Sequence, residues 1–137
     1  MNAGPPTALA DIYHGYLTCL NAQDWPNLAR FVAPDVRHNG RAFGLTGYLQ
    51  MLEADFRAIP DLHFRAEFLA VTPPMLASRL MFDCTPIGDL FGLAVNGQRL
   101  RFYENVFYRF EGNLIAEVWS IIDKTEIAQQ LNASGGV

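Results

Sequence analysis

Residues 99–122 read RLRFYENVFYRFEGNLIAEVWSII, and this stretch decides the fold class of the chain. Two apolar-rich runs, Arg99 to Phe110 and Leu114 to Ile122, flank the turn residues Glu111-Gly112-Asn113. This is the pattern of two antiparallel strands joined by a short connection. Both runs carry apolar residues on both faces, whereas an antiparallel sheet with one solvated face alternates cleanly. The stretch therefore predicts a long β-hairpin that is covered on both sides.

Outward from this hairpin, the apolar periodicity changes from helical to strand-like at Pro60. Thr46 is a candidate helix N-cap before the most regular of the helical runs. The expected elements are helices over 7–20, 24–32, 46–59 and 124–131, strands over 36–38, 62–70 and 75–85, and a loop over 88–97. Helices followed by a meander of antiparallel strands predict an α+β domain, with helices packed on one face of a strongly curved sheet that encloses a pocket.

The composition is that of one globular domain over residues 1–137, with an ordered core of about 7–131. Half of the residues are apolar, and the net charge of −4 lacks the basic excess that binding to nucleic acid or an acidic membrane requires. We find neither a signal-peptide pattern nor an apolar run of about 18 residues, so a cytoplasmic location is expected. Cys19 and Cys84 have no ligand or redox spacing and are expected to be buried free thiols.

A candidate catalytic carboxylate lies at the end of the second hairpin strand. Alternation places Glu117, Trp119 and Asp123 on one face. A carboxylate beside an indole can act as a general acid or base, because apolar surroundings raise its pKa toward neutrality. The alternative is structural, since Asp123 and Glu126 have the spacing of a capping box for the final helix. The spacing alone leaves both interpretations open.

His38 is a second candidate, because it shares a face with the core residue Val36, and Asn39 beside it adds an amide able to bind a carbonyl. The alternative is a hydrogen-bonded histidine at a strand end. His14 and His63 fall on polar faces, so the three histidines are too scattered to indicate a metal site.

Arg79 and Glu104 each interrupt an otherwise apolar face. A buried charge without a partner is costly. We therefore expect Arg79 and Glu104 to form an ion pair inside the domain, with a structural role ahead of a catalytic one. Both are also candidates to line the pocket.

Aromatic residues supply more surface than a small core requires. They include Tyr13, Tyr16, Tyr48, Phe56, Phe82, Phe102, Tyr103 and Trp119. Most are expected in the core, but aromatic-lined pockets favour flat, largely apolar ligands. Tyr16, Phe56 and Trp119 are the candidates for contact with such a ligand.

From about Thr7 to Leu131 the chain resembles the SnoaL-like polyketide cyclase family, part of the nuclear-transport-factor-2-like superfamily. The resemblance is carried by His38, the Phe56–Asp61 stretch with its Ile59-Pro60-Asp61 exit, Gly88-Asp89-Leu90-Phe91-Gly92-Leu93, Glu117, Trp119, Asp123 and Gln130-Leu131. It implies a cone-shaped domain and enzymes that close a ring by intramolecular aldol condensation without a metal or nucleotide cofactor. An aspartate at the position of Asp123 looks like the acid or base of those enzymes.

The chain departs from the family at one point. Cyclases of this kind commonly place a histidine in a Gly-Thr-His-Thr-Gly-like run after the third strand. Here the run is Cys84-Thr85-Pro86-Ile87-Gly88, and Pro86 supplies neither a proton nor a basic lone pair. A mechanism that uses that histidine therefore does not carry over.

The sequence thus predicts a cofactor-free, cyclase-like enzyme that acts on a small, largely apolar carbonyl compound. Asp123 would move the proton α to the carbonyl, His38 and Asn39 would orient the oxygen, and Trp119 would wall the site. The alternatives are an isomerase, dehydratase or epoxide hydrolase of the same superfamily, or a non-catalytic ligand-binding or dimerisation domain. A homodimer is expected through the convex side of the sheet, because the chain's own helices can cover only the other side.

Overall fold

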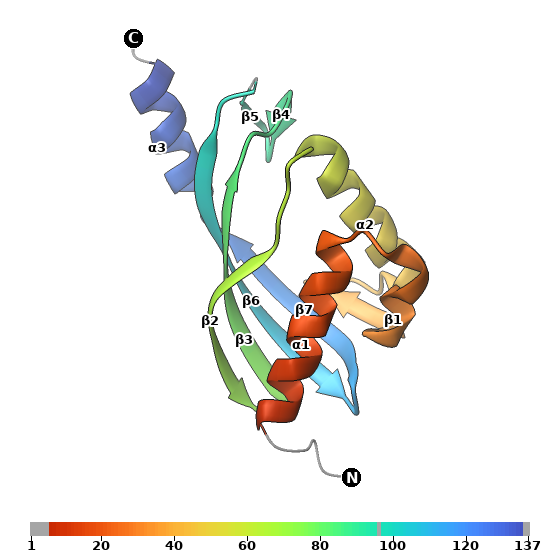
Figure 1. Cartoon of the computed structure of the whole chain (residues 1–137). Helices are drawn as coiled ribbons and strands as arrows, with labels where there is room; N and C mark the ends of the chain where they lie inside the picture. Colours follow the sequence, from red (N-terminus) through yellow and green to blue (C-terminus); the bar gives the residue numbers. More distant parts are fainter. Residues whose placement is uncertain (1–5, 96, 136–137) are drawn as a thin grey trace.

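The computed structural model describes residues 6–95 and 97–135, and it has a helical layer packed on a curved sheet (Figure 1). Its elements are α1 (Pro6–Asn21), the 3-10 helix η1 (Trp25–Arg30), β1 (Val32–His38), α2 (Gly44–Ala58), β2 (Arg65–Thr72), β3 (Met75–Cys84), β4 (Asp89–Leu90), β5 (Leu93–Ala94), β6 (Leu100–Glu111), β7 (Leu114–Ile122) and α3 (Lys124–Gly135). The α+β prediction is confirmed.

The main sheet has the strand order β1-β7-β6-β3-β2, and β4 pairs separately with β5. The β2–β3, β3–β6 and β6–β7 pairs are antiparallel, whereas β1 runs parallel to β7. The sequence predicted antiparallel strands only. Parallel pairing requires a long connection between the two strands, and β1 and β7 are separated by most of the chain.

The core side chains come from the helices and from the inner face of the sheet, two layers that face each other in Figure 1. On α1, Leu9, Tyr13, Tyr16 and Leu20 recur at three- and four-residue steps, and none is more than 2% exposed. This spacing places all four on the side of the helix that faces the sheet. The expected amphipathic helix is therefore present, one residue longer at each end than the periodicity indicated.

Element ends differ from expectation where backbone conformation outweighs side-chain pattern. Helix α2 begins at Gly44, whose φ is +66°. No side-chain hydrogen bond caps its start, and Thr46, the expected N-cap, lies inside the helix. Glycine adopts this left-handed conformation without strain, so the turn sets the start. The expected loop over 88–97 contains the β4–β5 hairpin, and α3 extends beyond residue 131. Residues 1–5, 96, 136 and 137 lie outside the described part of the chain.

A β-bulge in β7 changes which side chains face the core. Arg109 pairs with Glu117 and Phe110 with Ile115, which leaves Ala116 as an extra residue on β7. Ile115 is therefore fully buried, whereas Trp119 lies on the outer face at 36% exposure. Uninterrupted alternation would place Ile115 and Trp119 on the same face, so the bulge explains this error.

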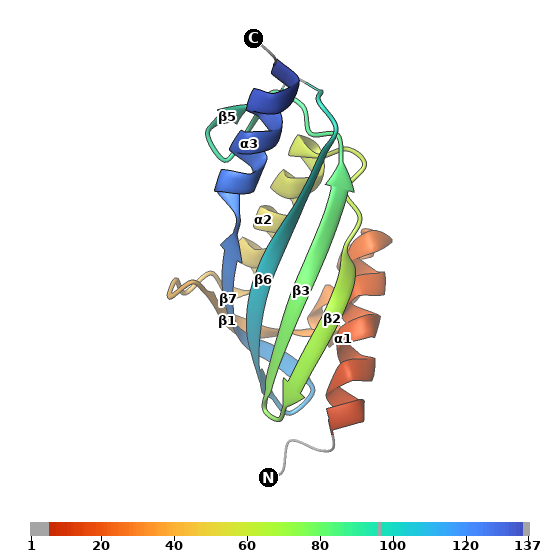
Figure 2. The same ribbon diagram turned by 90° about the vertical axis from the view of Figure 1, so that its left-hand side faces the viewer.

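In the described part of the chain, no helix lies over the outer face of β2, β3 and β6 (Figure 2). Four large apolar side chains on or beside this face are at least 36% exposed: Phe68, Phe107, Trp119 and Ile121. We call these four residues the outer apolar patch. Within the described residues, the chain's own helices thus cover only the inner side of the predicted hairpin.

Two further observations bear on the sequence expectations. Cys19 and Cys84 are both free and buried. Among the helices of the described segments, none is both long enough and apolar enough to cross a membrane.

Asn21 joins the end of α1 to the segment before β2. Its amide accepts a hydrogen bond from the Phe64 N–H (2.7 Å) and donates one to the Phe64 carbonyl (2.9 Å). Asn21→Ala leaves both groups of this buried residue without those partners, and we expect a loss of about 1–3 kcal/mol in unfolding free energy by urea denaturation. Asn27→Ala, which removes an exposed hydrogen bond to Asp24, is the control and should change stability by less than about 0.5 kcal/mol. Equal losses in the two variants would contradict this role.

Candidate active site

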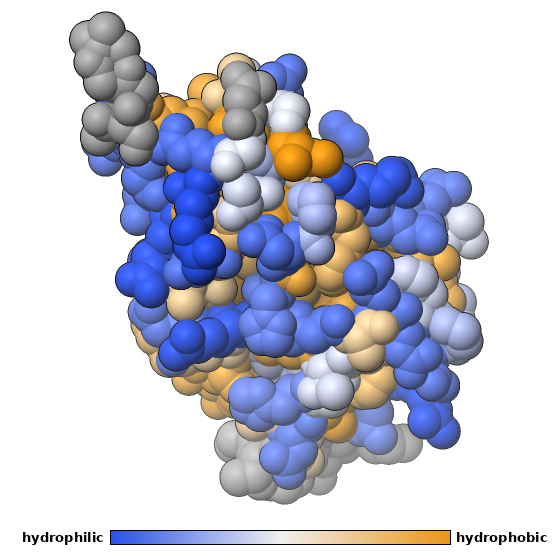
Figure 3. Space-filling model, turned by 45° about the horizontal axis from the view of Figure 1, so that its top comes forward, coloured by the Kyte–Doolittle hydropathy of each residue, from blue (hydrophilic) through white to orange (hydrophobic). Residues whose placement is uncertain are grey.

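Between α1, α2 and the inner face of the sheet lies a cavity of about 340 Å³. Its walls combine apolar residues with phenols, two carboxylates, one imidazole, one amide, one serine hydroxyl and one ammonium group: Tyr16, Leu20, His38, Asn39, Tyr48, Met51, Leu52, Asp55, Phe64, Leu80, Phe91, Glu104, Val106, Tyr108, Val118, Ser120, Ile122 and Lys124. Viewed from above, apolar surface shows between hydrophilic side chains (Figure 3). The polar side chains in its lining make the cavity more polar than the sequence predicted.

Two carboxylates face this cavity from opposite layers of the fold. Glu104 lies on the inner face of β6 together with Phe102 and Val106, which are nearly fully buried. Asp55 lies on α2, three residues after the buried Leu52. Both side chains line the cavity, so a bound molecule would contact a carboxyl group on each side.

Both carboxyl groups have a raised pKa. Burial raises the pKa of Glu104, but the Ser120 hydroxyl donates a hydrogen bond to its carboxylate and opposes the rise. Burial, and then the negative charge of Glu104, raise the pKa of Asp55 from 3.8 to about 7. Beside the charge of Glu104, Asp55 therefore retains its proton up to near-neutral pH.

Two phenols supply a hydrogen-bond donor in the same cavity. The Tyr16 and Tyr48 hydroxyls lie 2.6 Å apart, so one donates to the other and one O–H remains free to donate elsewhere. Burial raises the pKa of both tyrosines, which keeps them neutral. Tyr108 differs: Tyr13 donates to Ser78 (2.9 Å), so the 3.1 Å bond between Tyr13 and Tyr108 uses the Tyr108 proton.

His38 and Asn39 lie where β1 ends beside the cavity. The His38 ring lines the cavity and stacks on Phe43, with 5.4 Å between ring centroids. Burial, and then the charge of Arg41, lower the pKa of His38, which favours the neutral imidazole. Asn39 also lines the cavity, but its amide bonds the Ser120 backbone, accepting from N–H (2.8 Å) and donating to C=O (3.3 Å).

The family of the chain follows from comparison with known proteins. The family model for SnoaL-like polyketide cyclases matches residues 10–131. The chain belongs to this family. The family prediction made from the sequence motifs is therefore confirmed.

Solved structures agree with the assignment to the SnoaL-like family. A SnoaL-like polyketide cyclase from Agrobacterium tumefaciens is 52% identical, with 90% of this chain and 98% of that chain covered and a TM-score of 0.89. TsrD from Streptomyces laurentii (21% identity, 95% and 98% covered, TM-score 0.82) and IdmH from Streptomyces antibioticus (20%, 90% and 97%, 0.78) share the fold. No curated protein gives a significant match.

Asp123, the aspartate to which the SnoaL-like resemblance gave the acid or base role, does not line the cavity. Its side chain is exposed and accepts a hydrogen bond from the Glu126 N–H (3.1 Å) at the start of α3. The expectation that Asp123 faces an enclosed cavity is wrong, and the capping alternative describes its geometry. The physical reason is the bulge at Ala116, which reverses the facing of β7, so that Asp123 continues the outward row of Trp119 and Ile121 just after the strand ends at Ile122.

Arg79 and Glu104 do not form the predicted ion pair, because they lie on opposite faces of the sheet. Glu104 pairs across the ladder with Leu80, so Arg79 points outward. There Arg79 lies 3.6 Å from Glu67, donates to Asn105 (3.0 Å) and covers the Tyr103 ring. Glu104 lines the cavity as expected, and Arg79 does not.

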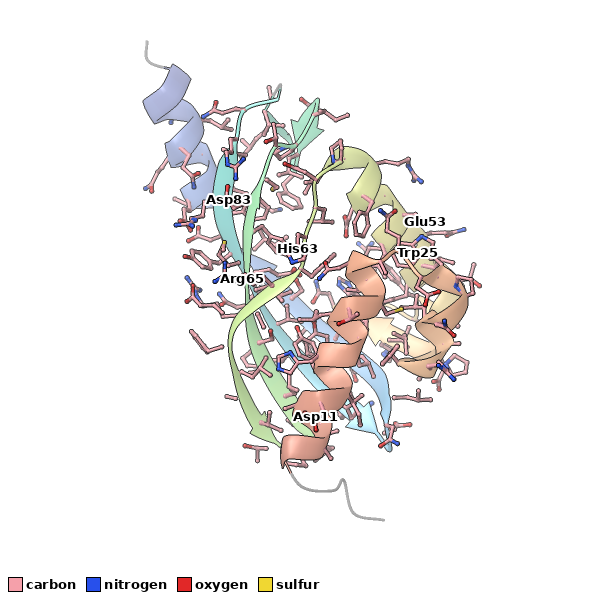
Figure 4. All side chains as sticks on the ribbon, viewed as in Figure 1. Asp11, Trp25, Glu53, His63, Arg65 and Asp83 are labelled. Carbon is pink, nitrogen blue, oxygen red and sulfur yellow. The ribbon has the colours of Figure 1, made fainter. Side chains whose placement is uncertain are left out.

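Phe56 and Trp119 are also absent from the cavity lining. Phe56 contacts Trp25 and Phe64, with ring centroids 5.8 Å and 6.1 Å away; Trp25 is labelled beside α2 in Figure 4. Trp119 faces outward because of the bulge in β7. Of the aromatic candidates for ligand contact, only Tyr16 lines the cavity.

Asp55 is the main site residue that the sequence analysis missed. Residues 48, 52, 55 and 59 occupy one face of a helix, so Asp55 is a charge on the apolar face of α2. That position was the available signal. His14 and His63 are exposed as expected (His63 is labelled in Figure 4), and the described residues hold no group of three His, Cys, Asp or Glu able to bind a metal ion.

The proton on Asp55 predicts a pH dependence of stability. The folded chain holds this proton up to about pH 7, whereas the ordinary value is 3.8, so the folded state binds more protons between these limits and its stability falls as pH rises. Asp55→Asn should abolish a fall on the order of several kcal/mol between about pH 4 and 8, measured by urea unfolding. Asp11→Asn on the exposed side of α1 is the control. Parallel profiles for the native chain and Asp55→Asn would refute the assignment.

Proposed function

We propose that this protein is an acid–base enzyme that closes a ring in a small carbonyl compound by intramolecular aldol addition, with Glu104 as base and Asp55 as acid. The observation that carries the proposal is that two carboxyl groups line one cavity from opposite layers of the fold, with the pKa of Asp55 raised to about 7. A general base must be ionised and a general acid protonated at the same pH. Membership in the SnoaL-like family supports the reaction class.

In the first step, the Glu104 carboxylate removes a proton from the carbon α to a carbonyl. The negative charge moves to the carbonyl oxygen and forms an enolate. The free O–H of the Tyr16–Tyr48 pair donates a hydrogen bond to that oxygen, which stabilises the charge as it develops. His38, held neutral, is the second polar group available to orient the substrate.

In the second step, the enolate carbon attacks another carbonyl carbon of the same molecule. A C–C bond forms, the ring closes, and the π electrons of the attacked carbonyl move to its oxygen. Asp55 transfers its proton to that oxygen and becomes a carboxylate. Glu104 now carries the proton taken from carbon, and exchange with solvent restores both groups, so substrate and product are isomers.

Enolisation tests the base without knowledge of the natural substrate. In D₂O, a panel of neutral 1,3-diketones should exchange the α-hydrogen for deuterium faster with the native protein than in buffer alone, as followed by NMR. Glu104→Gln should lower the exchange rate by roughly 100-fold or more, because an amide cannot accept the proton. Asp123→Asn should leave the rate unchanged, since asparagine also caps helices well.

Three outcomes would count against this proposal. Loss of exchange in Asp123→Asn with retention in Glu104→Gln would restore Asp123 as the base. Retention in both variants would remove the role of Glu104. No acceleration of exchange over buffer by the native protein, with any diketone that binds, would favour a non-catalytic ligand-binding domain.

We further propose that two copies of the chain associate through the outer face of the sheet. The outer apolar patch gathers four large exposed apolar side chains on one side of the sheet, a feature that marks interaction sites. It flanks a groove of about 230 Å³ whose lining includes Phe68, Ala77 and Phe107. An apolar face of this kind is suited to the same face of a second copy.

Light scattering at micromolar concentration should give twice the 15.3 kDa chain mass for the native protein. Replacing Phe107 and Ile121 together by Lys should yield monomer, because the charges cannot be desolvated in the interface. Asp11→Lys, a charge change on exposed α1, should leave the mass unchanged. A native protein with the mass of one chain would exclude the dimer.

A further inference from the structure

A second, smaller cavity of about 70 Å³ adjoins the main one. The two cavities share five lining residues: Asp55, Phe64, Phe91, Glu104 and Ile122. Both carboxyl groups are among them and therefore lie where the cavities meet. A carbonyl group placed between these carboxyl groups has the main cavity on one side and the smaller one on the other.

The smaller cavity is otherwise apolar. Its remaining lining residues are Ile59, Leu62, Phe82, Leu90 and Phe102, and none is more than 8% exposed. We call these five residues, with the space they surround, the side pocket. Among the residues that the structure describes, Asp55 and Glu104 are its only polar lining residues. A hydrocarbon group bound there would therefore deprive no polar group of the wall, other than the two carboxyl groups, of a hydrogen-bond partner.

The size of the side pocket sets the size of that group. An apolar cavity of roughly 150 Å³ holds one benzene molecule, which has six carbons. A space of about 70 Å³ is half as large. The side pocket therefore has room for an alkyl group of about two or three carbons.

We propose that the side pocket binds a short alkyl substituent, ethyl to propyl, on or beside the reacting carbonyl of the substrate. The inference rests on the proposed function only in placing the carbonyl between Asp55 and Glu104. It assigns the substrate class as a ketone with one short alkyl end, whose larger part fills the main cavity. Leu62 and Leu90 are then residues that determine chain-length specificity.

A homologous series of neutral ketones tests the side pocket by binding alone: acetophenone, propiophenone, butyrophenone, valerophenone and hexanophenone, titrated by NMR against the native protein. Each methylene that enters the side pocket should tighten binding by about four-fold. The increase should continue to butyrophenone and then stop or reverse. Increments that continue unchanged through hexanophenone, or a flat series, would overturn the proposal.

Two variants on the side pocket and one on the main cavity locate the effect. Leu62→Phe fills the side pocket, so it should flatten the series while retaining acetophenone binding. Leu90→Ala enlarges the side pocket and should move the break to valerophenone or beyond. Met51→Phe, at a residue that lines only the main cavity, should weaken all five ketones by a common factor and keep the increments.

The variants also separate this inference from the proposed function. If Leu62→Phe does not fold, as judged by circular dichroism, Leu90→Ala decides the outcome, and an unmoved break contradicts the side pocket. A chain-length break without deuterium exchange would support the side pocket and reject the enzyme. Deuterium exchange that depends on Glu104, together with a ketone series that shows no chain-length break, would support the enzyme and reject the side pocket.

Discussion

The burial of the Glu104 carboxylate is the constraint on which the rest of the site depends. Its position on β6 lies between Phe102 and Val106, where water is largely excluded, and a carboxylate there is costly unless it is hydrogen-bonded. No cation is among the groups that shift its pKa. The Ser120 hydroxyl supplies the hydrogen bond, and the facing Asp55 avoids a second negative charge by keeping its proton.

The strands are arranged so that this hydrogen bond can form. Ser120 faces inward because the extra residue Ala116 changes the facing of β7 beyond the bulge. The Asn39 amide forms hydrogen bonds with both backbone groups of Ser120, and these bonds connect the end of β1 to this point of β7. Asn39 was expected to bind a carbonyl of the ligand. The amide instead binds the chain itself, and so fixes the residue that holds Glu104.

The two faces of the sheet differ in the side chains that they present. The inner face contributes Glu104, Tyr108 and Ser120 to the cavity lining, while the outer face presents apolar side chains and the ion pair of Arg79 with Glu67. Because side chains alternate along each strand, consecutive residues lie on opposite faces and have different surroundings. Arg79 and Leu80 illustrate this on β3, as Trp119 and Ser120 do on β7.

The sequence by itself determined the family, the α+β class and most elements, because helical and strand periodicity and short family motifs are local properties of the chain. It also marked Glu104 as a charge on an apolar face, and His38 and Tyr16 as residues of the pocket. Only the tertiary structure decided which faces meet. Three features depend on pairing between distant segments: the bulge at Ala116, the end of β7 before Asp123 and the placement of Asp55 opposite Glu104. Local spacing in the sequence does not predict that pairing. A carboxylate becomes an acid or base through what surrounds it, and those surroundings exist only once helices and sheet have packed together.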